Sequence, residues 1–156
     1  MKAVSDSGPL IHLNELALLS CLNVFQRVLI PQEIENELKE LTRFGKNVEK
    51  VELDANSKNK AEIFARQFSL DLGESEALAL AKQMKIETLL TDDLDCREAA
   101  KQLSLTPVGT IGIIIASYKK RIISKQKCVD VIKNIKAKST LFITQELIDY
   151  AIEKIK

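Results

Sequence analysis

Apolar residues along the chain follow two different spacings. Short runs of apolar, β-prone residues predict strands, whereas apolar residues three and four positions apart predict amphipathic helices. The predicted strands cover residues 2–5, 28–30, 88–91 and 105–108, with a further small strand over 139–143. The predicted helices cover 10–22, 31–41, 61–68, 77–84, 96–103 and 113–118, followed by one capped by Ser124 and a terminal one capped by Thr144. This alternation predicts a three-layer α/β/α sandwich with a mainly parallel central sheet, in which Pro107 places its strand at an edge.

Acidic residues directly follow two of the predicted strands. Asp6 comes after the strand over 2–5, and Asp92, Asp93 and Asp95 come after the strand over 88–91. In open α/β sheets the ligand crevice lies outside the carboxyl ends of the strands, so side chains at these positions are expected to face it. The alternative is a local role. Asp6 before Ser-Gly-Pro suits an Asx-turn or a helix N-cap, and Asp95, more than Asp93, suits the start of the following helix.

Three glutamates on predicted helices are placed where they can join these acids. Glu37 flanks the apolar stripe of the helix over 31–41, at the edge where a helix meets a cleft. Glu74 and Glu76 precede the helix over 77–84 and are predicted in its first turn. Each has a simpler interpretation, because Glu37 alone is typical of a solvated helix residue and the other two complement a helix dipole. Together with the strand-end acids, they predict one acidic site.

A polar and basic stretch over 42–59 is predicted to be a flexible flap. Arg43 and Lys46 belong to it, and Arg97 and Lys101 lie on the helix that follows the central acids. We interpret these four residues as candidates for phosphate contacts. The alternative for the flap is a solvated, charge-rich loop without a ligand.

The length of 156 residues predicts a single domain over residues 1–156. Hydrophobic residues make up 46% of the chain and charged residues 29%, which is typical of a globular protein and excludes a disordered one. The net charge of +1 neither indicates nor excludes a nucleic-acid partner, because a local patch decides that. Three widely spaced cysteines without a CxxC pair argue against zinc and disulfides, and His12 is predicted to lie on a helix face. The lack of a signal peptide or bilayer-spanning run predicts a cytoplasmic protein without a membrane contact.

The clustered carboxylates predict a hard divalent cation. Like charges a few ångströms apart cannot all remain ionised without one, and oxygen ligands without nitrogen or sulfur partners select Mg²⁺ or Mn²⁺. Such an ion would polarise a phosphoryl group and help to generate hydroxide for in-line attack. The chain has no GxxxxGK[ST] and no GxGxxG, which argues against a P-loop NTPase and a dinucleotide site. An aspartyl-phosphate enzyme built on Asp6 stays open, although TPVGT lacks the lysine expected after a late strand.

Four motifs in order resemble those of the PIN-domain nucleases, and the later VGTIGIIIA and LFITQEL resemble the DUF3368 branch. The motifs are VSDSGPLI, IPQEIENEL, LGESEALALA and LLTDDLDCREAA. The resemblance implies metal ligation by Asp6, Glu37, Glu76 and Asp93, with Ser7 supporting the first of them. It leaves Glu74, Asp92 and Asp95 as alternate or supporting ligands. Many toxin members have Asp where Glu76 stands, and the doubled Asp92-Asp93 leaves open which carboxylate faces the ion.

Our hypothesis from the sequence is a ribonuclease that depends on Mg²⁺ or Mn²⁺. Water attacks a backbone phosphate of RNA, the 3′ oxygen leaves, and the product carries a 5′-phosphate. Glu37 is the first choice for the residue that orients or deprotonates the water. The resemblance also implies the toxin of a toxin-antitoxin pair, a homodimer, and inhibition by a small antitoxin protein. The alternative is a catalytically weak PIN module that binds protein or nucleic acid.

Overall fold

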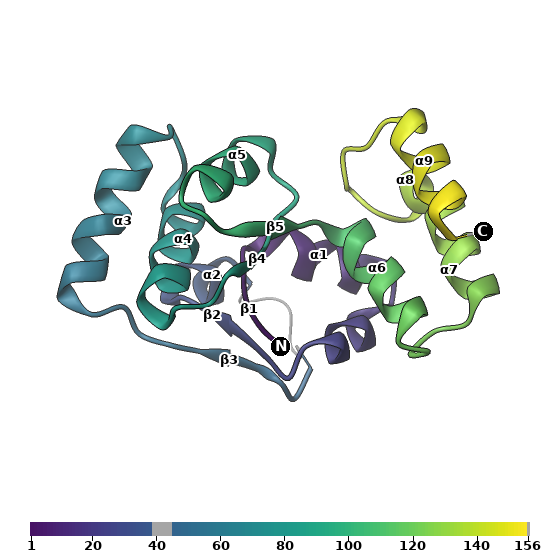
Figure 1. Ribbon diagram of the computed structural model, residues 1–156, viewed down its shortest axis with the longest axis horizontal. Helices are drawn as coiled ribbons and strands as arrows, with labels where there is room; N and C mark the ends of the chain where they lie inside the picture. The colour runs from purple at the N-terminus through teal and green to yellow at the C-terminus, as the bar shows by residue number, and fades with distance from the viewer. Residues whose placement is uncertain (39–44, 156) are drawn as a thin grey trace.

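A five-stranded sheet forms the centre of the protein (Figure 1). The computed structural model describes residues 1–38 and 45–155. The strands are β1 (Lys2–Ser5), β2 (Arg27–Ile30), β3 (Val48–Lys50), β4 (Thr88–Leu90) and β5 (Thr106–Val108), in the order β3-β2-β1-β4-β5. Every pairing is parallel. The prediction that the Pro107 strand lies at an edge is confirmed, because β5 ends the sheet.

The strand order changes direction between β1 and β4. From β1 the chain continues to β2 and β3 on one side, and it later crosses to β4 and β5 on the other side. A crevice opens at the carboxyl ends of two such strands, because their connections leave in opposite directions. Ser5 of β1 pairs with Leu90 of β4, so the residues that follow them are neighbours at this switch point.

Helices cover both faces of the sheet, which confirms the predicted three-layer α/β/α sandwich. One face carries α1 (Ser7–Glu15), the 3-10 helix η1 (Leu19–Val24) and α6 (Thr110–Lys119), with α7 (Lys125–Lys133), α8 (Ile135–Lys138) and α9 (Gln145–Ile155) beyond them. The other face carries α4 (Leu72–Met84) and α5 (Leu94–Gln102), with α3 (Ala55–Gln67) packed on α4; α2 (Gln32–Glu37) follows β2. Figure 1 shows α3 and the C-terminal helices at opposite ends of the molecule.

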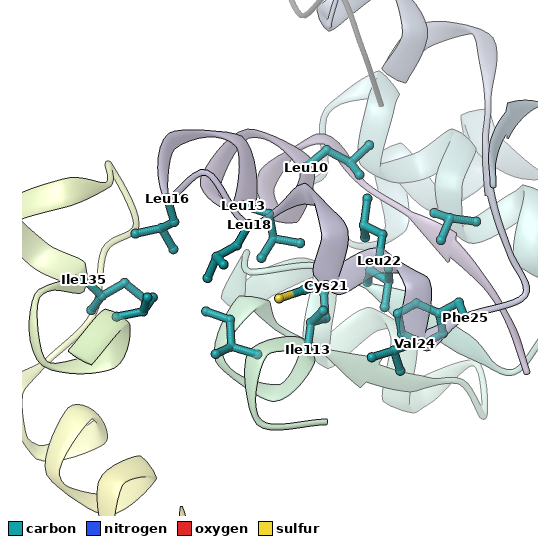
Figure 2. Close-up of a cluster of buried hydrophobic side chains, with 14 of the residues drawn as sticks. Leu10, Leu13, Leu16, Leu18, Cys21, Leu22, Val24, Phe25, Ile113 and Ile135 are labelled. Atoms are coloured by element: carbon teal, nitrogen blue, oxygen red, sulfur yellow. The ribbon is translucent and has the colours of Figure 1, made fainter. Parts of the chain in front are cut away.

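Alternation along the strands divides the core into two hydrophobic clusters. Ala3 and Leu90 belong to the cluster under α1 and α6, whereas their chain neighbours Val4 and Leu89 belong to the cluster under α4 and α5. Successive side chains of a strand point to opposite faces, so each short strand supplies both layers. Figure 2 shows the first cluster, in which Leu10 and Leu13 of α1 and Cys21 of η1 pack near Ile113 of α6.

The structure corrects two sequence predictions about loops. The stretch over 42–59 is not a flap throughout, because β3 pairs with β2 and Asp54 caps α3 by accepting a hydrogen bond from Ser57 N at 2.7 Å. Residues 139–143 form no strand; Thr140 N instead donates to Glu15 Oε1 at 2.9 Å. In both places the structure joins segments far apart in the sequence, because β3 pairs with β2 and Thr140 contacts Glu15. Within residues 1–38 and 45–155, no helix is both long and apolar enough to cross a bilayer.

The end of α4 generates a stability prediction. Lys85 caps this helix in the left-handed conformation, with φ of 55°, and its side chain is exposed. Glycine adopts this conformation without the steric cost of a Cβ. Lys85→Gly is therefore expected to raise the free energy of unfolding by about 0.5–1 kcal/mol, measured by urea denaturation.

The matched control is Lys60→Gly, an exposed position in the interior of α3. There the same change is expected to lower the free energy of unfolding by about 1 kcal/mol. Equal destabilisation by both substitutions would contradict the assignment of strain to the end of α4.

Candidate active site

Two aspartates meet at the switch point of the sheet. Asp6 directly follows β1 and Asp93 is the third residue after β4, and Asp6 N donates to Leu90 O at 2.9 Å. The side chain of Thr91, which is fully buried, joins them. Its hydroxyl donates to Asp6 Oδ2 at 3.1 Å and accepts from Asp93 N at 3.3 Å. The sequence analysis assigns Thr91 only to a strand, although Thr91, Asp92 and Asp93 form a T-x-D motif within LLTDDLDCREAA.

Each of these aspartates also caps a helix. Asp6 Oδ1 accepts from Ser7 N at 2.8 Å at the start of α1, and Asp93 Oδ1 accepts from Cys96 N at 2.8 Å at the start of α5. The capping alternative is therefore confirmed for Asp6. For the acids after β4, the sequence favours Asp95 over Asp93 for a local role at the helix start; Asp93 is the N-cap, and Asp95 lies exposed in the first turn of α5. One carboxylate oxygen of Asp93 has no hydrogen-bond partner within the described ranges and remains open to a ligand.

The first turn of α4 adds a third carboxylate to this pair. Asp71 caps the helix by accepting from Glu74 N at 2.8 Å, and Glu74 lies in the first turn. Burial, followed by the nearby Asp71, Asp93 and Asp6, raises the pKa of Glu74 to about 9. The sequence interpretation did not count Asp71 as a site residue, although a helix N-cap before an acidic first turn was a signal for it.

Glu76 faces a different direction. The prediction that it lies in the first turn is wrong, because α4 begins at Leu72 and Glu76 belongs to the following turn. Its Oε1 accepts from Glu33 N at 3.1 Å, at the start of α2. The structure therefore brings Glu74, rather than Glu76, next to Asp6 and Asp93.

Glu37 lies at the margin of the acidic group. Its carboxylate sits against Gly73, where a Cβ would collide with Oε1, so this glycine allows α2 to approach α4. Burial, followed by repulsion from Asp71, Glu33 and Glu76, raises the pKa of Glu37, and the Ser7 hydroxyl partly offsets the rise. Glu37 also contributes to the raised pKa of Asp6, which ties it electrostatically to the strand-end acids.

Asp92 points away from this group. Its Oδ1 accepts from Thr110 N at 2.7 Å, its Oδ2 accepts from the Thr110 hydroxyl at 2.6 Å, and His12 Nδ1 lies 2.7 Å from Oδ2. Asp92 thus fastens the end of β4 to the start of α6 and to the last turn of α1. Both Asp92 and Asp93 line the cleft, and Asp93, rather than Asp92, contributes to the raised pKa of Glu74. His12 lies on a helix face as predicted, but its partnership with Asp92 was missed.

The phosphate-contact candidates differ in their position relative to the cleft. Arg97 lines the cleft beside the acids and donates to Thr91 O at 3.1 Å. Lys101 is exposed and pairs with Glu98 at 3.3 Å, and Lys46 is exposed in the loop before β3. Arg43 lies outside the described residues. Of the three candidates that the structure describes, Arg97 is the one that lines the cleft beside the acids.

The acids line one side of a cleft of about 1070 Å³. Its walls include Asp6, Ser7, Asp71, Glu74, Asp93 and Asp95, whereas the opposite wall comes from residues 140–144 and α9. Glu37 and Glu76 are not among the described residues that line it. The cleft is therefore acidic at the carboxyl ends of β1 and β4 and mixed aromatic and basic on the C-terminal side.

Electrostatic repulsion accumulates in the acidic wall. Burial, followed by the charges of Asp71 and Glu37, raises the pKa of Asp6 from 3.8 to about 6, although Ser7 and Thr91 donate to it. Cys96 is fully buried below the acids, and burial with their charge holds the pKa of its thiol far above the usual range. Cys96 therefore stays a thiol and does not compete as a metal ligand.

The donor set at this wall fits a hard divalent cation. Asp6, Glu74 and Asp93 offer carboxylate oxygens only, which suits Mg²⁺ or Mn²⁺. Among the residues that the structure describes, no three His, Cys, Asp or Glu side chains lie close enough together to hold a metal ion. Mg²⁺ usually keeps several waters and uses one or two carboxylates, so an incomplete cage agrees with that chemistry.

A comparison with protein families adds an independent finding. A family model described as DUF3368, a PIN domain, matches residues 2–156. No curated protein and no solved structure matches the chain. The match extends over β1, α4 and β4, which supply the acidic wall.

The raised pKa of Asp6 predicts a pH-dependent loss of stability. Between about pH 4 and pH 6 the unfolded chain loses this proton before the folded protein does, so stability falls as the pH rises through that window. Asp6→Asn removes the penalty and keeps an acceptor for Ser7 N. In EDTA at pH 7.5 the variant is expected to be more stable by about 1–3 kcal/mol in urea unfolding, and the gain should disappear near pH 4. A variant of lower stability than the wild type at pH 7.5 would refute this account of Asp6.

Proposed function

Because the chain belongs to the DUF3368 family of PIN domains, which are generally nucleases, we propose that it is a ribonuclease that depends on Mg²⁺ or Mn²⁺. The observation that carries the proposal is the joint placement of Asp6, Glu74 and Asp93 at one wall of a cleft. Their mutual repulsion has no structural benefit in a metal-free protein, and a divalent cation would relieve it. We therefore assign these three carboxylates to the ion.

Neighbouring residues hold the three carboxylates in place in this proposal, and the other acids are not all assigned to the ion. Thr91 and Ser7 fix the orientation of Asp6, and Asp71 fixes the start of α4 and hence Glu74. The family resemblance favours Glu76 as a ligand, whereas the contacts of Glu74 favour Glu74. Asp92 and Asp95 are not assigned to the ion, because Asp92 accepts hydrogen bonds from Thr110 and Asp95 is exposed in the first turn of α5.

A divalent ion at this wall would polarise the scissile phosphate and favour ionisation of water. The chain supplies the other parts of the reaction. Arg97, beside the acids, neutralises a non-bridging phosphate oxygen. Glu37 stays the base predicted from the sequence: its raised pKa suits proton transfer near neutral pH, although it is not among the described residues that line the cleft. The phosphodiester breaks at the 3′ oxygen, and the new end carries a 5′-phosphate.

A role as the toxin of a toxin-antitoxin pair, a small antitoxin partner and a homodimer stay predictions from the family resemblance. The toxin role and its inhibition by an antitoxin both depend on access to the cleft, as the proposed reaction does. An inhibitor that fills the cleft would prevent both metal and RNA from reaching Asp6 and Asp93.

The two candidate glutamates of α4 can be separated by activity. With a fluorescent single-stranded RNA and Mn²⁺, Glu74→Gln, Asp6→Asn and Asp93→Asn are each expected to reduce the cleavage rate by at least about 100-fold, because each removes a charged ligand. Glu76→Gln should reduce it by less than about tenfold. Wild-type cleavage should stop in EDTA.

The matched control is Glu98→Gln, an exposed carboxylate on α5 that pairs with Lys101. It should cleave RNA at the wild-type rate. Equal residual cleavage in all variants would indicate a contaminating nuclease. Metal binding without cleavage by any preparation would favour the binding module over the enzyme.

The same assignment predicts stabilisation by metal. At a hundredfold excess of Mn²⁺ over its dissociation constant, binding to the folded state should raise the free energy of unfolding by about 3 kcal/mol. The rise should be strongly reduced in Asp93→Asn and retained in Glu98→Gln, as measured by thermal unfolding with and without EDTA. A melting temperature that does not respond to Mn²⁺ would count against the metal site.

A further inference from the structure

Charge is distributed very unevenly along the chain. Between Lys119 and Lys138 there are eight Lys and Arg residues and one Asp, a net charge of +7. The rest of the chain therefore carries a net charge of −6, although the total is only +1. This basic segment comprises the end of α6, α7 and α8 (Figure 1). We refer to it as the basic surface.

Within the described ranges the cations of the basic surface lack acidic partners; Lys120 Nζ donates to the carbonyl oxygen of Val24 at 3.1 Å. All eight are exposed. Across the described ranges none of them lies in an ion pair, in contrast to Arg27, Lys50 and Lys101, which pair with glutamates. Unpaired cations gathered on adjacent elements attract a polyanion, whereas two such surfaces would repel one another. A second copy of this chain is therefore a poor occupant.

The basic surface continues into the C-terminal wall of the cleft. Lys138 ends α8, and two residues later Thr140 begins the segment that lines the cleft. On this wall Phe142 is 92% exposed and Tyr150 of α9 is 60% exposed. Lys154 Nζ lies 5.2 Å from the centre of the Tyr150 ring, so an aromatic face and a cation stand together. Neither ring is buried in the hydrophobic core, so core packing does not account for these two aromatic residues.

We propose that these features form a track for single-stranded RNA, with unpaired bases stacked on Phe142 and Tyr150 and the phosphates beyond the cleft held by the basic surface. The identification of the strand as RNA rests on the proposed function. Exposed aromatic rings favour single strands, because bases inside a duplex do not offer their faces. The track leads the strand from the acidic wall, which repels phosphates, onto the part of the chain that attracts them.

The basic surface is tested by binding in EDTA, where no metal-dependent cleavage occurs. The probe is a fluorescein-labelled, unstructured RNA of about 20 nucleotides, followed by anisotropy between about 50 and 200 mM KCl. The double substitution Lys136→Glu and Lys138→Glu is expected to weaken binding by at least about tenfold at the lowest salt. The slope of log affinity against log salt should fall by about 1.4, which corresponds to two phosphate contacts on a single strand.

The control is the double substitution Lys58→Glu and Lys60→Glu, which makes the same charge change on exposed positions of α3, at the other end of the molecule (Figure 1). It should leave affinity and slope close to those of the wild type, and circular dichroism should show all variants folded. Equal losses in both pairs, or no loss in either, would overturn the proposal. Preferential binding to vesicles of phosphatidylserine and phosphatidylcholine over RNA would also overturn it.

The aromatic part is tested with Phe142→Ala. This variant should bind the single strand about tenfold more weakly and bind a duplex of the same sequence as the wild type does. Ile63→Ala, a half-exposed position on α3, is the matched control and should have no effect. An unchanged affinity of Phe142→Ala for the single strand would refute stacking. Because all these measurements exclude metal, they stand even if no RNA cleavage is found.

Discussion

Repulsion between carboxylates at the ends of β1 and β4 is the constraint on which the arrangement of the site depends. Three helix N-termini partly offset this repulsion. Asp6, Asp71 and Asp93 cap α1, α4 and α5, so backbone N–H groups and the positive ends of three helices face the acids. This compensation is incomplete, since the pKa of Asp6 is still raised to about 6 and that of Glu74 to about 9.

The caps join folding and function in the same side chains. Asp6 and Asp93 each use one carboxylate oxygen to start a helix, and Thr91 holds them in a defined relation across the β1–β4 pair. Asp92 has a structural role instead, because its contacts with Thr110 and His12 fasten α6 and α1 to the sheet. The adjacent Asp92 and Asp93 therefore serve different purposes. Asp93 stands beside the other carboxylates, and Asp92 links elements of the fold. The C-terminal helices complete the cleft with aromatic and basic side chains, so the two walls have opposite chemical character.

The sequence predicted the layers and the acidic end of the sheet because both follow from local patterns. The apolar, β-prone runs of β1 and β4, and the acids directly after them, were sufficient for this prediction. The error at Glu76 arose from a helix start misplaced by a few residues, which changes the face that a side chain occupies. The partners of Asp92 and the pairing of β3 depend on residues far away in the chain, and no local pattern reports them. Thr91 was visible in the T-x-D motif, but its hydroxyl bridge requires the β1–β4 register.

The most direct test of the central claim is the number of protons released when Mn²⁺ binds. In the metal-free protein the raised pKa of Glu74 keeps its carboxyl group protonated at pH 7.5. Calorimetric titration in buffers of different ionisation enthalpy should therefore detect the release of about one proton for each ion bound, and Glu74→Gln should abolish that release. Binding of Mn²⁺ without proton release, or no binding at all, would contradict a cation held by Asp6, Glu74 and Asp93.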